Sequence, residues 1–202
     1  MIHFSPEELS ERDNYKFLIG SIIPRPIALI TSQSKDEILN IAPFSYFNIV
    51  TSNPPIVSVA FQRKNGQQKD TARNILDRKE AVIHIVDRLN VDDANQTAAS
   101  LAPDKSELGR TNFTLEDSEK VMIPSLKESK IRFEVELFEH IEVKDNEIVG
   151  ADLLLLKIKE YHIDELIYEE GRIDPDGLGA ISRLAGHDYA EIGERFTIKR
   201  PD

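Results

Sequence analysis

The fold is indicated most clearly by the stretch IRFEVEL, residues 131–137. Its apolar residues alternate with charged ones, which is the pattern of a strand with one buried and one solvated face. The polar sequence KDNE, residues 144–147, comes next and leads into an apolar stretch from Ile148 to Ile158. We therefore predict a long antiparallel hairpin.

More strands are predicted on the N-terminal side of this hairpin. Short runs rich in β-branched and aromatic residues occur at Pro26–Ser32, Pro43–Val50, Ile56–Phe61 and Ala81–Val86. We interpret Pro43 as a break in the strand pairing that precedes it. Because strands outnumber helices, we expect a mainly β protein, an antiparallel barrel with peripheral helices. The alternative is a doubly wound α/β sheet, but strands and helices do not alternate regularly.

Three helices and an irregular tail complete the predicted organisation. SPEE, residues 5–8, is a capping box with proline at the first helical position. Apolar residues recur at helical spacing over residues 70–79 and again from about Asp92. Beyond Asp174 there are four glycines and little periodicity, so we expect a tail that is functional or docked on the rest of the chain.

Composition is that of an ordinary soluble globular protein. The chain has 202 residues, 40% of them apolar and 30% charged, which suggests a single domain over residues 1–202. No apolar run approaches the ~20 residues of a membrane span, and the first residues lack the features of a signal peptide. We therefore expect a cytoplasmic protein. The absence of cysteine excludes disulfides, thiolate nucleophiles and cysteine-ligated zinc.

Charge is distributed unevenly along the chain. The net charge of −11 argues against nucleic acid or an anionic membrane as partner. Residues 62–80 nevertheless hold six cations against three anions, whereas residues 134–176 hold fourteen acids against four bases. A positive island in an acidic protein suits a small anionic ligand, and a solvated charged face is the alternative interpretation.

The sequence KDT, residues 69–71, stands where a helix is predicted to begin. A helix N-terminus exposes unpaired N–H groups and a partial positive charge, so it can bind phosphate. Lys69 can add a point charge and Thr71 a hydroxyl donor. Asp70 would repel a phosphate, so we interpret it as the N-cap of the helix. An ordinary capped helix start remains the alternative.

Two further motifs suggest the rest of a ligand site. In NIAPFSYFN, residues 40–48, aromatic and hydrogen-bonding side chains alternate, so Ser45 and Asn48 can face the edge of a flat heterocycle. An amphipathic strand is the alternative. In PRPIALIT, residues 24–31, Arg25 is held between two prolines, which suits a fixed ion pair or phosphate contact as well as a surface turn.

Several classes of site are excluded. The five histidines lack metal-ligand spacing, so no metal is expected. No G-x-G-x-x-G, G-x-x-x-x-G-K or G-x-S-x-G motif occurs, which excludes a Rossmann dinucleotide site, a P-loop and a nucleophile elbow.

Taken in order, the motifs resemble the flavin reductase-like family, which binds FMN on a split β-barrel. Three more stretches share the resemblance: NQTA at residues 95–98, YHID at 161–164 and SRLAGHDY at 182–189. It covers nearly the whole chain, from about Tyr15 to Pro201, and implies an antiparallel split β-barrel.

The resemblance also implies the cofactor and its ligands. Lys69 and Thr71 would hold the FMN phosphate with Arg63 nearby, and Arg183 would close the site, in relatives often across a homodimer interface. No catalytic side chain is implied, because the flavin carries the chemistry. The full set of cofactor-binding residues expected is Arg25, Thr31, Phe44, Ser45, Tyr46, Phe47, Asn48, Ala60, Phe61, Gln62, Arg63, Lys69, Asp70, Thr71 and Arg183.

The function implied is an NAD(P)H-dependent flavin reductase that transfers a hydride to flavin N5, with NADH or NADPH as donor. Residues 144–147 lack the Gly-Asp-His of compact NADH-using relatives. That difference leaves open a flavoredoxin-like electron-transfer flavoprotein reduced by a protein partner, or a non-catalytic FMN-binding protein. A homodimer and a monooxygenase or electron-transfer partner are implied as well.

Overall fold

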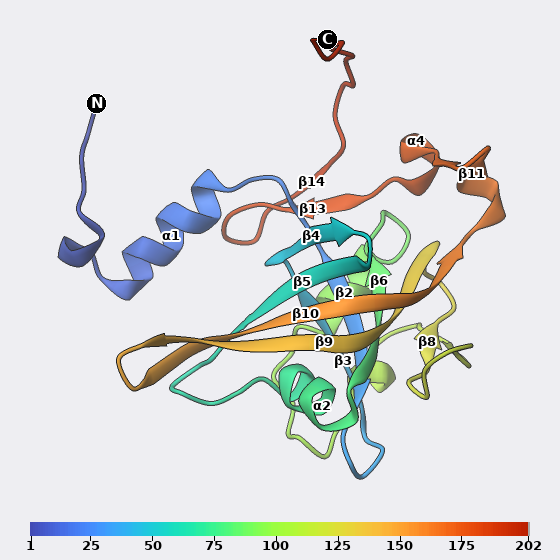
Figure 1. Cartoon of the computed structure of the whole chain (residues 1–202), viewed down its shortest axis with the longest axis horizontal. Coiled ribbons are helices and arrows are strands. Elements are labelled where there is room, and N and C mark those ends of the chain that lie inside the picture. Colours follow the sequence, from blue (N-terminus) through green and yellow to red (C-terminus); the bar gives the residue numbers. More distant parts are fainter. Residues whose placement is uncertain (202) are drawn as a thin grey trace.

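The computed structural model describes residues 1–201 and is built around one antiparallel sheet (Figure 1). Its seven strands lie in the order β3-β2-β6-β9-β10-β5-β4. The sheet curls until the bend after β3 meets β5, where Ala60 N donates to Tyr46 O at 2.9 Å. The strands are β2 (Ala28–Gln33), β3 (Leu39–Phe44), β4 (Phe47–Ser52), β5 (Pro55–Gln62), β6 (Glu80–Ile85), β9 (Ile131–Asp145) and β10 (Ile148–Ile163). The predicted antiparallel split β-barrel is confirmed, and the doubly wound alternative is wrong.

The hairpin that indicated the fold is confirmed and is longer than predicted. Strand β10 extends to Ile163, and Asn146 takes a left-handed conformation, with φ 51°, in the turn that joins it to β9. Along β10 the buried residues alternate with less buried ones, as a half-buried strand requires. Leu154 and Leu156 face the barrel interior, where they pack with Phe61 and with Ile75 of the helix that covers the barrel.

The helices lie around this barrel. They are α1 (Glu11–Ser21), α2 (Asp70–Arg78), α3 (Val91–Gln96) and α4 (Pro175–Leu178), with 3-10 turns η1 (Pro6–Glu8), η2 (Glu107–Arg110) and η3 (Glu165–Ile167). Helix α2 covers the barrel, and α1 stands away from it (Figure 1). Among residues 1–201 no helix is long and apolar enough to cross a membrane.

The predicted N-terminal helix is only partly right. The SPEE box yields the short turn η1, whereas the longer helix α1 begins after Ser10, whose hydroxyl accepts from Asp13 N at 3.1 Å. Most of α1 is solvent-exposed. Its apolar side chains therefore do not form the buried stripe by which a helix is recognised in a sequence.

The predicted strand Pro43–Val50 is wrong in its boundaries. The chain bends at Ser45–Tyr46, so that β3 ends at Phe44 and β4 starts at Phe47. Pro43 does not break the pairing, because it lies opposite Leu29 within β3. Strand β3 is at the edge of the sheet, where a residue without an N–H group costs little.

The expectation of a docked tail is confirmed as far as Glu191, where part of the tail is regular, whereas residues 192–201 are exposed and run away from the barrel (Figure 1). Strand β1 (Arg25–Pro26) pairs with β13 (Ile181–Arg183), which in turn pairs with β14 (Tyr189–Glu191). The remaining short strands are β7 (Leu115–Glu116), β8 (Ser125–Leu126), β11 (Tyr168–Glu169) and β12 (Arg172–Ile173). The β1-β13-β14 sheet brings residues near both ends of the sequence to one side of the barrel.

Candidate cofactor-binding cleft

Three adjoining hollows form one cleft between the bend after β3, the start of α2 and the β13–β14 segment. Pro43 and Phe44 line all three of them, so the end of β3 is the middle of the cleft. The largest of the three has a volume of about 320 Å³. Together they are spacious enough for a cofactor-sized molecule.

Lys69 and Thr71, the predicted phosphate ligands, lie at the start of α2, at one end of the cleft. Thr71 is 2% exposed, and its hydroxyl oxygen accepts from Asn40 Nδ2 at 2.7 Å. A hydroxyl that accepts in this way keeps its own hydrogen for a ligand. Lys69 lines two of the hollows, and in residues 1–201 no hydrogen bond or ion pair engages its ammonium group.

The prediction that Asp70 caps α2 is wrong. Lys69 occupies the N-cap position, with extended backbone angles and no side-chain capping bond, and Asp70 is the first helical residue. The Asp70 carboxylate instead pairs with Arg73, one turn further along, at 2.6 Å. This i,i+3 pair offsets part of the negative charge that Asp70 brings to the cleft.

Glu107 adds a second acid to the same end of the cleft, and it was not predicted. It is 6% exposed and accepts from Ile41 N at 2.9 Å. Burial raises the pKa of its carboxyl, and the hydrogen bond from the Ile41 amide opposes that rise. An anion in the cleft therefore has to approach from the side of Lys69.

The bend at Ser45–Tyr46 supplies the aromatic and polar wall beside Phe44. Ser45 and Tyr46 line the hollow that also contains Ala60 and Gln62 of β5. Burial raises the pKa of the Tyr46 hydroxyl, and Tyr15 of α1 raises it further. Phe44 packs edge-on against Phe61, with ring centroids 4.5 Å apart, so its ring is fixed from the barrel side.

Arg183 closes the opposite end of the cleft. Its guanidinium lies over the ring of Tyr189, 4.4 Å from the centroid, and Tyr189 in turn donates to Asn95 Oδ1 of α3 at 3.1 Å. All three residues line the same hollow. A cation–π contact of this kind holds the arginine in place without neutralising its charge.

Arg25 lines the cleft, but its guanidinium group is engaged by backbone carbonyl oxygens. It is 7% exposed and donates to the carbonyl oxygens of Ile19 at 2.8 Å, Ile22 at 2.6 Å and Leu184 at 2.9 Å. These bonds satisfy the end of α1 and attach it to the segment after β13. Its positive charge still lies next to Ser45, at 3.5 Å.

Five predicted residues lie outside the cleft. Thr31 is fully buried and donates to Pro124 O at 2.8 Å, and Phe61 is fully buried in the barrel core. Phe47 and Asn48 line a neighbouring hollow with Leu18 of α1 and with Ile22, which follows α1. The guanidinium of Arg63 is bound to Asp152, at 2.9 and 2.7 Å, and does not face the cleft.

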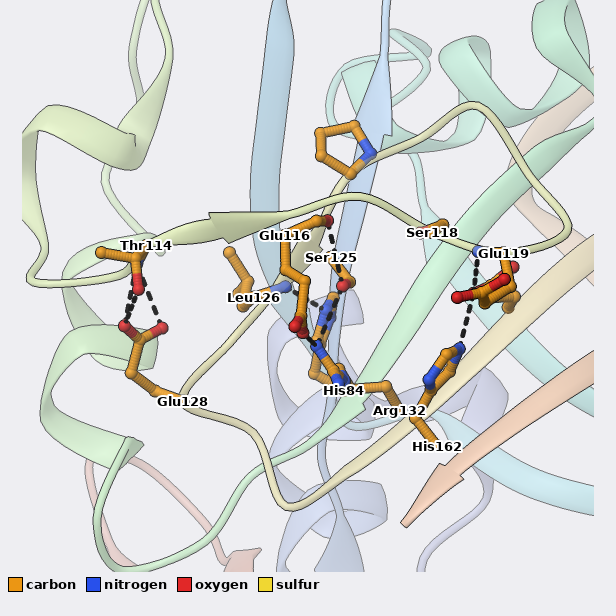
Figure 2. A network of polar contacts seen from close by, with 12 residues as sticks. His84, Thr114, Glu116, Ser118, Glu119, Ser125, Leu126, Glu128, Arg132 and His162 are labelled. Carbon is orange, nitrogen blue, oxygen red and sulfur yellow. Dashed lines mark hydrogen bonds and ion pairs between the residues drawn. The ribbon is translucent and has the colours of Figure 1, made fainter. Parts of the chain in front are cut away.

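A second polar cluster lies away from the cleft, around the loop before β8 (Figure 2). His84 is fully buried, donates from Nδ1 to Leu29 O at 3.0 Å and accepts at Nε2 from Leu126 N at 2.9 Å. Burial lowers the pKa of His84 to about 3, so the ring is neutral. His162 Nε2 donates to Glu134 at 2.6 Å. Within residues 1–201 no group of side chains is arranged to hold a metal ion.

The cleft thus combines unused donors at one end, aromatic walls in the middle and a cation at the other end. Such a surface can bind a flat ring that carries an anionic group. Comparison with known families gives one match over most of the chain: the family described as flavin reductase like domain matches residues 19–175.

Three known proteins are similar over nearly their whole length. The chain is 46% identical to the uncharacterized Bacillus subtilis (strain 168) protein YwrF, with 100% of both chains covered. The structure of nitrilotriacetate monooxygenase component B from Bacillus cereus is 47% identical, with a TM-score of 0.96 and 98% of both chains covered. The Pseudomonas fluorescens 2-nitrobenzoate 2-nitroreductase NbaA is 26% identical, with a TM-score of 0.88 and coverage of 99% and 96%.

Proposed function

This chain belongs to the flavin reductase-like family, and from that premise we propose that it binds FMN in the cleft and reduces it with a nicotinamide donor. The observation that carries the proposal is the pairing of unused donors at Lys69 and Thr71 with the aromatic wall at Phe44 and Tyr46. A ligand with a phosphate at one end and a flat ring at the other matches this distribution.

The phosphate is assigned to the start of α2. The first amides of that helix have no intrahelical partner and carry a partial positive charge. Lys69 adds a full charge, and the Thr71 hydroxyl can donate. Because Asp70 is paired with Arg73 and Glu107 is bonded to Ile41, these two acids are held by neighbours of their own.

The ring is assigned to the wall formed by the bend after β3. Phe44 and Tyr46 offer apolar surface for stacking, and Ser45 offers a hydroxyl to the ring edge. Arg183 places a positive charge at the same part of the cleft. A cation near the ring stabilises the negative charge that a flavin gains on reduction.

When bound, FMN supplies the redox chemistry, by accepting a hydride from NADH or NADPH at N5. The residues of the chain then have to bind the two molecules, orient them and exclude water. That division of labour fits a cleft in which, among residues 1–201, no hydrogen bond joins a lining hydroxyl to a histidine or a carboxylate.

The partners follow from the same proposal. Because the Bacillus cereus relative is a monooxygenase component, we assign to this chain a monooxygenase that consumes the reduced flavin. A second copy is the other partner. Apolar side chains at the end of α1, directly after it and in β4 are exposed, namely Leu18 at 56%, Ile22 at 61%, Ile49 at 77% and Val50 at 49%, and a homodimer would cover them.

A second candidate is an electron-transfer flavoprotein that receives its electrons from a protein. The observation in its favour is the turn at residues 144–147, which lacks the Gly-Asp-His of compact NADH-using relatives. A third is an FMN-binding protein without redox activity.

The phosphate assignment is tested by the double substitution Lys69→Ala with Thr71→Ala. The dissociation constant for FMN should rise by about 100-fold or more, since a hydrogen bond to a charged group contributes roughly 1.5–3 kcal/mol. Riboflavin, which has no phosphate, should bind the variant and the native protein equally. The matched control is Lys64→Ala, an exposed lysine of the same positive island outside the cleft. Unchanged FMN affinity in the double variant contradicts the assignment.

The reaction is tested by anaerobic titration of the FMN-loaded protein with NADH and with NADPH. Bleaching of the flavin absorption within the time of a catalytic turnover supports the reductase. Flavin that stays oxidised with both nicotinamides, yet is bleached by dithionite, excludes the reductase and favours the electron-transfer candidate.

A further inference from the structure

We propose that Asp152 on β10 is a positioning residue for the phosphate end of the cleft: it fixes the loop Arg63–Gln68, which ends next to Lys69. The inference rests on the proposed function, because it assigns Lys69 to the FMN phosphate. The loop Arg63–Gln68 and the side chains that hold it are called the clasp below, and they comprise Arg63, Gln68, His140 and Asp152.

Asp152 receives four hydrogen bonds although it is fully buried. Arg63 donates from Nε at 2.9 Å and from Nη2 at 2.7 Å, Gln68 Nε2 donates at 3.0 Å, and His140 Nε2 donates at 2.9 Å. Burial alone would raise the pKa of the Asp152 carboxyl. The bonds from Arg63, His140 and Gln68 outweigh burial and hold that pKa below its usual value.

The donors come from both ends of one loop. Arg63 is its first residue and Gln68 its last, and Lys69 follows directly. Between them Lys64 and Gln67 exchange backbone hydrogen bonds at 3.2 and 3.0 Å, around a turn in which Gly66 has φ 74°. The Arg63 amide also donates to Gly150 O at 2.8 Å. One carboxylate therefore fixes both ends of a loop that makes a tight turn of its own.

The clasp also explains why Arg63 does not reach the cleft. Arg63 is held by Asp152 and by Glu142 of β9, at 3.0 Å. The charge of Arg63 is therefore neutralised by these two acids. Lys69, which follows the loop, carries its charge into the cleft instead. On the N-terminal side of Lys69, the backbone is anchored to the barrel by the side-chain bonds to Asp152 and by the Arg63 amide on Gly150 O. A supporting contact of this kind decides how precisely a binding group is held.

The substitution Asp152→Asn breaks the clasp at nearly constant volume, because an amide group then faces donors. We expect FMN affinity to fall by about tenfold. A displacement of a binding group by about 1 Å can cost up to roughly 10²-fold, and the loop keeps its backbone bonds in this variant, so the displacement should be smaller. Riboflavin affinity should stay within about twofold, because the ring wall is unaffected. The matched control is Asp145→Asn, an exposed aspartate of the same hairpin.

Two readouts separate positioning from a general loss of structure. In a double-mutant cycle, Asp152→Asn added to Lys69→Ala should cost no further FMN affinity, because Asp152 acts through Lys69. Amide hydrogen exchange in the flavin-free protein should accelerate at residues 63–69 and stay unchanged in the other strands. If Asp152→Asn fails to fold, Gln68→Ala, which removes one donor of four, carries the same comparisons with a smaller effect.

Equal losses for FMN and riboflavin, additive losses in the cycle, or unchanged exchange at residues 63–69 would each overturn the inference. Failure of the proposed function has a different signature, since the native protein would then bind neither flavin. The exchange measurement still decides whether Asp152 holds the loop in that case.

Discussion

Asp152 and Glu134 are two buried carboxylates on one hairpin, and each is bonded to a histidine of the opposite strand. Asp152 on β10 accepts from His140 on β9 at 2.9 Å, and Glu134 on β9 accepts from His162 on β10 at 2.6 Å. Both carboxylates have no exposed surface. Both hold a loop against the barrel, at the cleft in one case and at the loop before β8 in the other.

The two carboxylates differ in their other donors. Glu134 accepts from the backbone amides of Glu119 at 2.7 Å, Lys120 at 2.5 Å and Val121 at 3.2 Å. Asp152 accepts from side chains instead. A loop held through its amides can change its side chains freely, whereas the clasp exists only with particular residues at positions 63 and 68. The comparison separates a purely structural anchor from one that the cleft depends on.

The largest effect on stability is expected from Glu134→Gln. Burial alone would raise the pKa of the Glu134 carboxyl, but the amides of Glu119 and Lys120 and the ring of His162 lower it, so the group is charged and fully used. The variant puts an amide group against donors and should lose about 3–5 kcal/mol of unfolding free energy. Urea denaturation measures that loss, with the exposed Glu139→Gln as control. FMN affinity of the folded variant should be unchanged, and a selective loss of FMN binding would erase the distinction between the two anchors.

The free energy of unfolding should depend on pH through His84, which lies on the Glu134 side of the molecule. Its pKa is about 3 in the folded protein, below the ordinary value of 6.5, so between these values the unfolded chain binds more protons. Stability is therefore complete above about pH 6.5 and falls as the pH is lowered toward 3, by about 1.4 kcal/mol per pH unit. His84→Gln keeps a donor and an acceptor without titrating. Unfolding free energies of both proteins from pH 7 to 5 test this, and parallel curves would contradict it.

The smallest effects are expected from the two histidines that face the carboxylates. His162→Ala should cost about 1–2 kcal/mol of stability and leave FMN affinity unchanged. This is the lower part of the range for a hydrogen bond to a charged group, because the His162 side chain is partly exposed to water. His140→Ala should cost about the same stability but also weaken FMN binding several-fold, because it loosens the clasp. The two side chains are similarly exposed, at 25% and 24%, so each serves as the other's control. Identical FMN affinities in the two variants would argue against the distinction between Glu134 as a structural anchor and Asp152 as an anchor of the cleft.

The elements predicted well from the sequence are those with a one-sided burial pattern. The β9–β10 hairpin and α2 each bury one face, so period two and period 3.6 are visible in their residues. The N-terminal helix was predicted too early, at residues 5–8, because the apolar residues Tyr15, Phe17 and Leu18 of α1 are exposed and form no buried stripe. The bend at Ser45–Tyr46 was missed because the alternation of aromatic and polar residues continues through it without a glycine or proline.

The candidate site was predictable where it is continuous in sequence. Phe44 to Tyr46 and Lys69 to Thr71 come together because two short motifs carry them. Glu107, Asn95 and Tyr189 come from distant segments that meet the cleft only after folding; NQTA and SRLAGHDY marked the last two solely by resemblance. Arg63 is predicted near the phosphate by the resemblance and by its place in the positive island. Its partner Asp152 could not be foreseen, because it is 89 residues away within a stretch that has the pattern of a strand interior.

The link between Arg25 and the carbonyl of Leu184, 159 residues apart, has a consequence for how the protein is made. Strand β1 has no pairing partner until β13 has been synthesised, and Arg183 arrives with β13. The barrel strands β2 to β10 can pair before that, since all of them precede residue 164. The Arg183 side is therefore the last part of the cleft to be completed in the order of the chain.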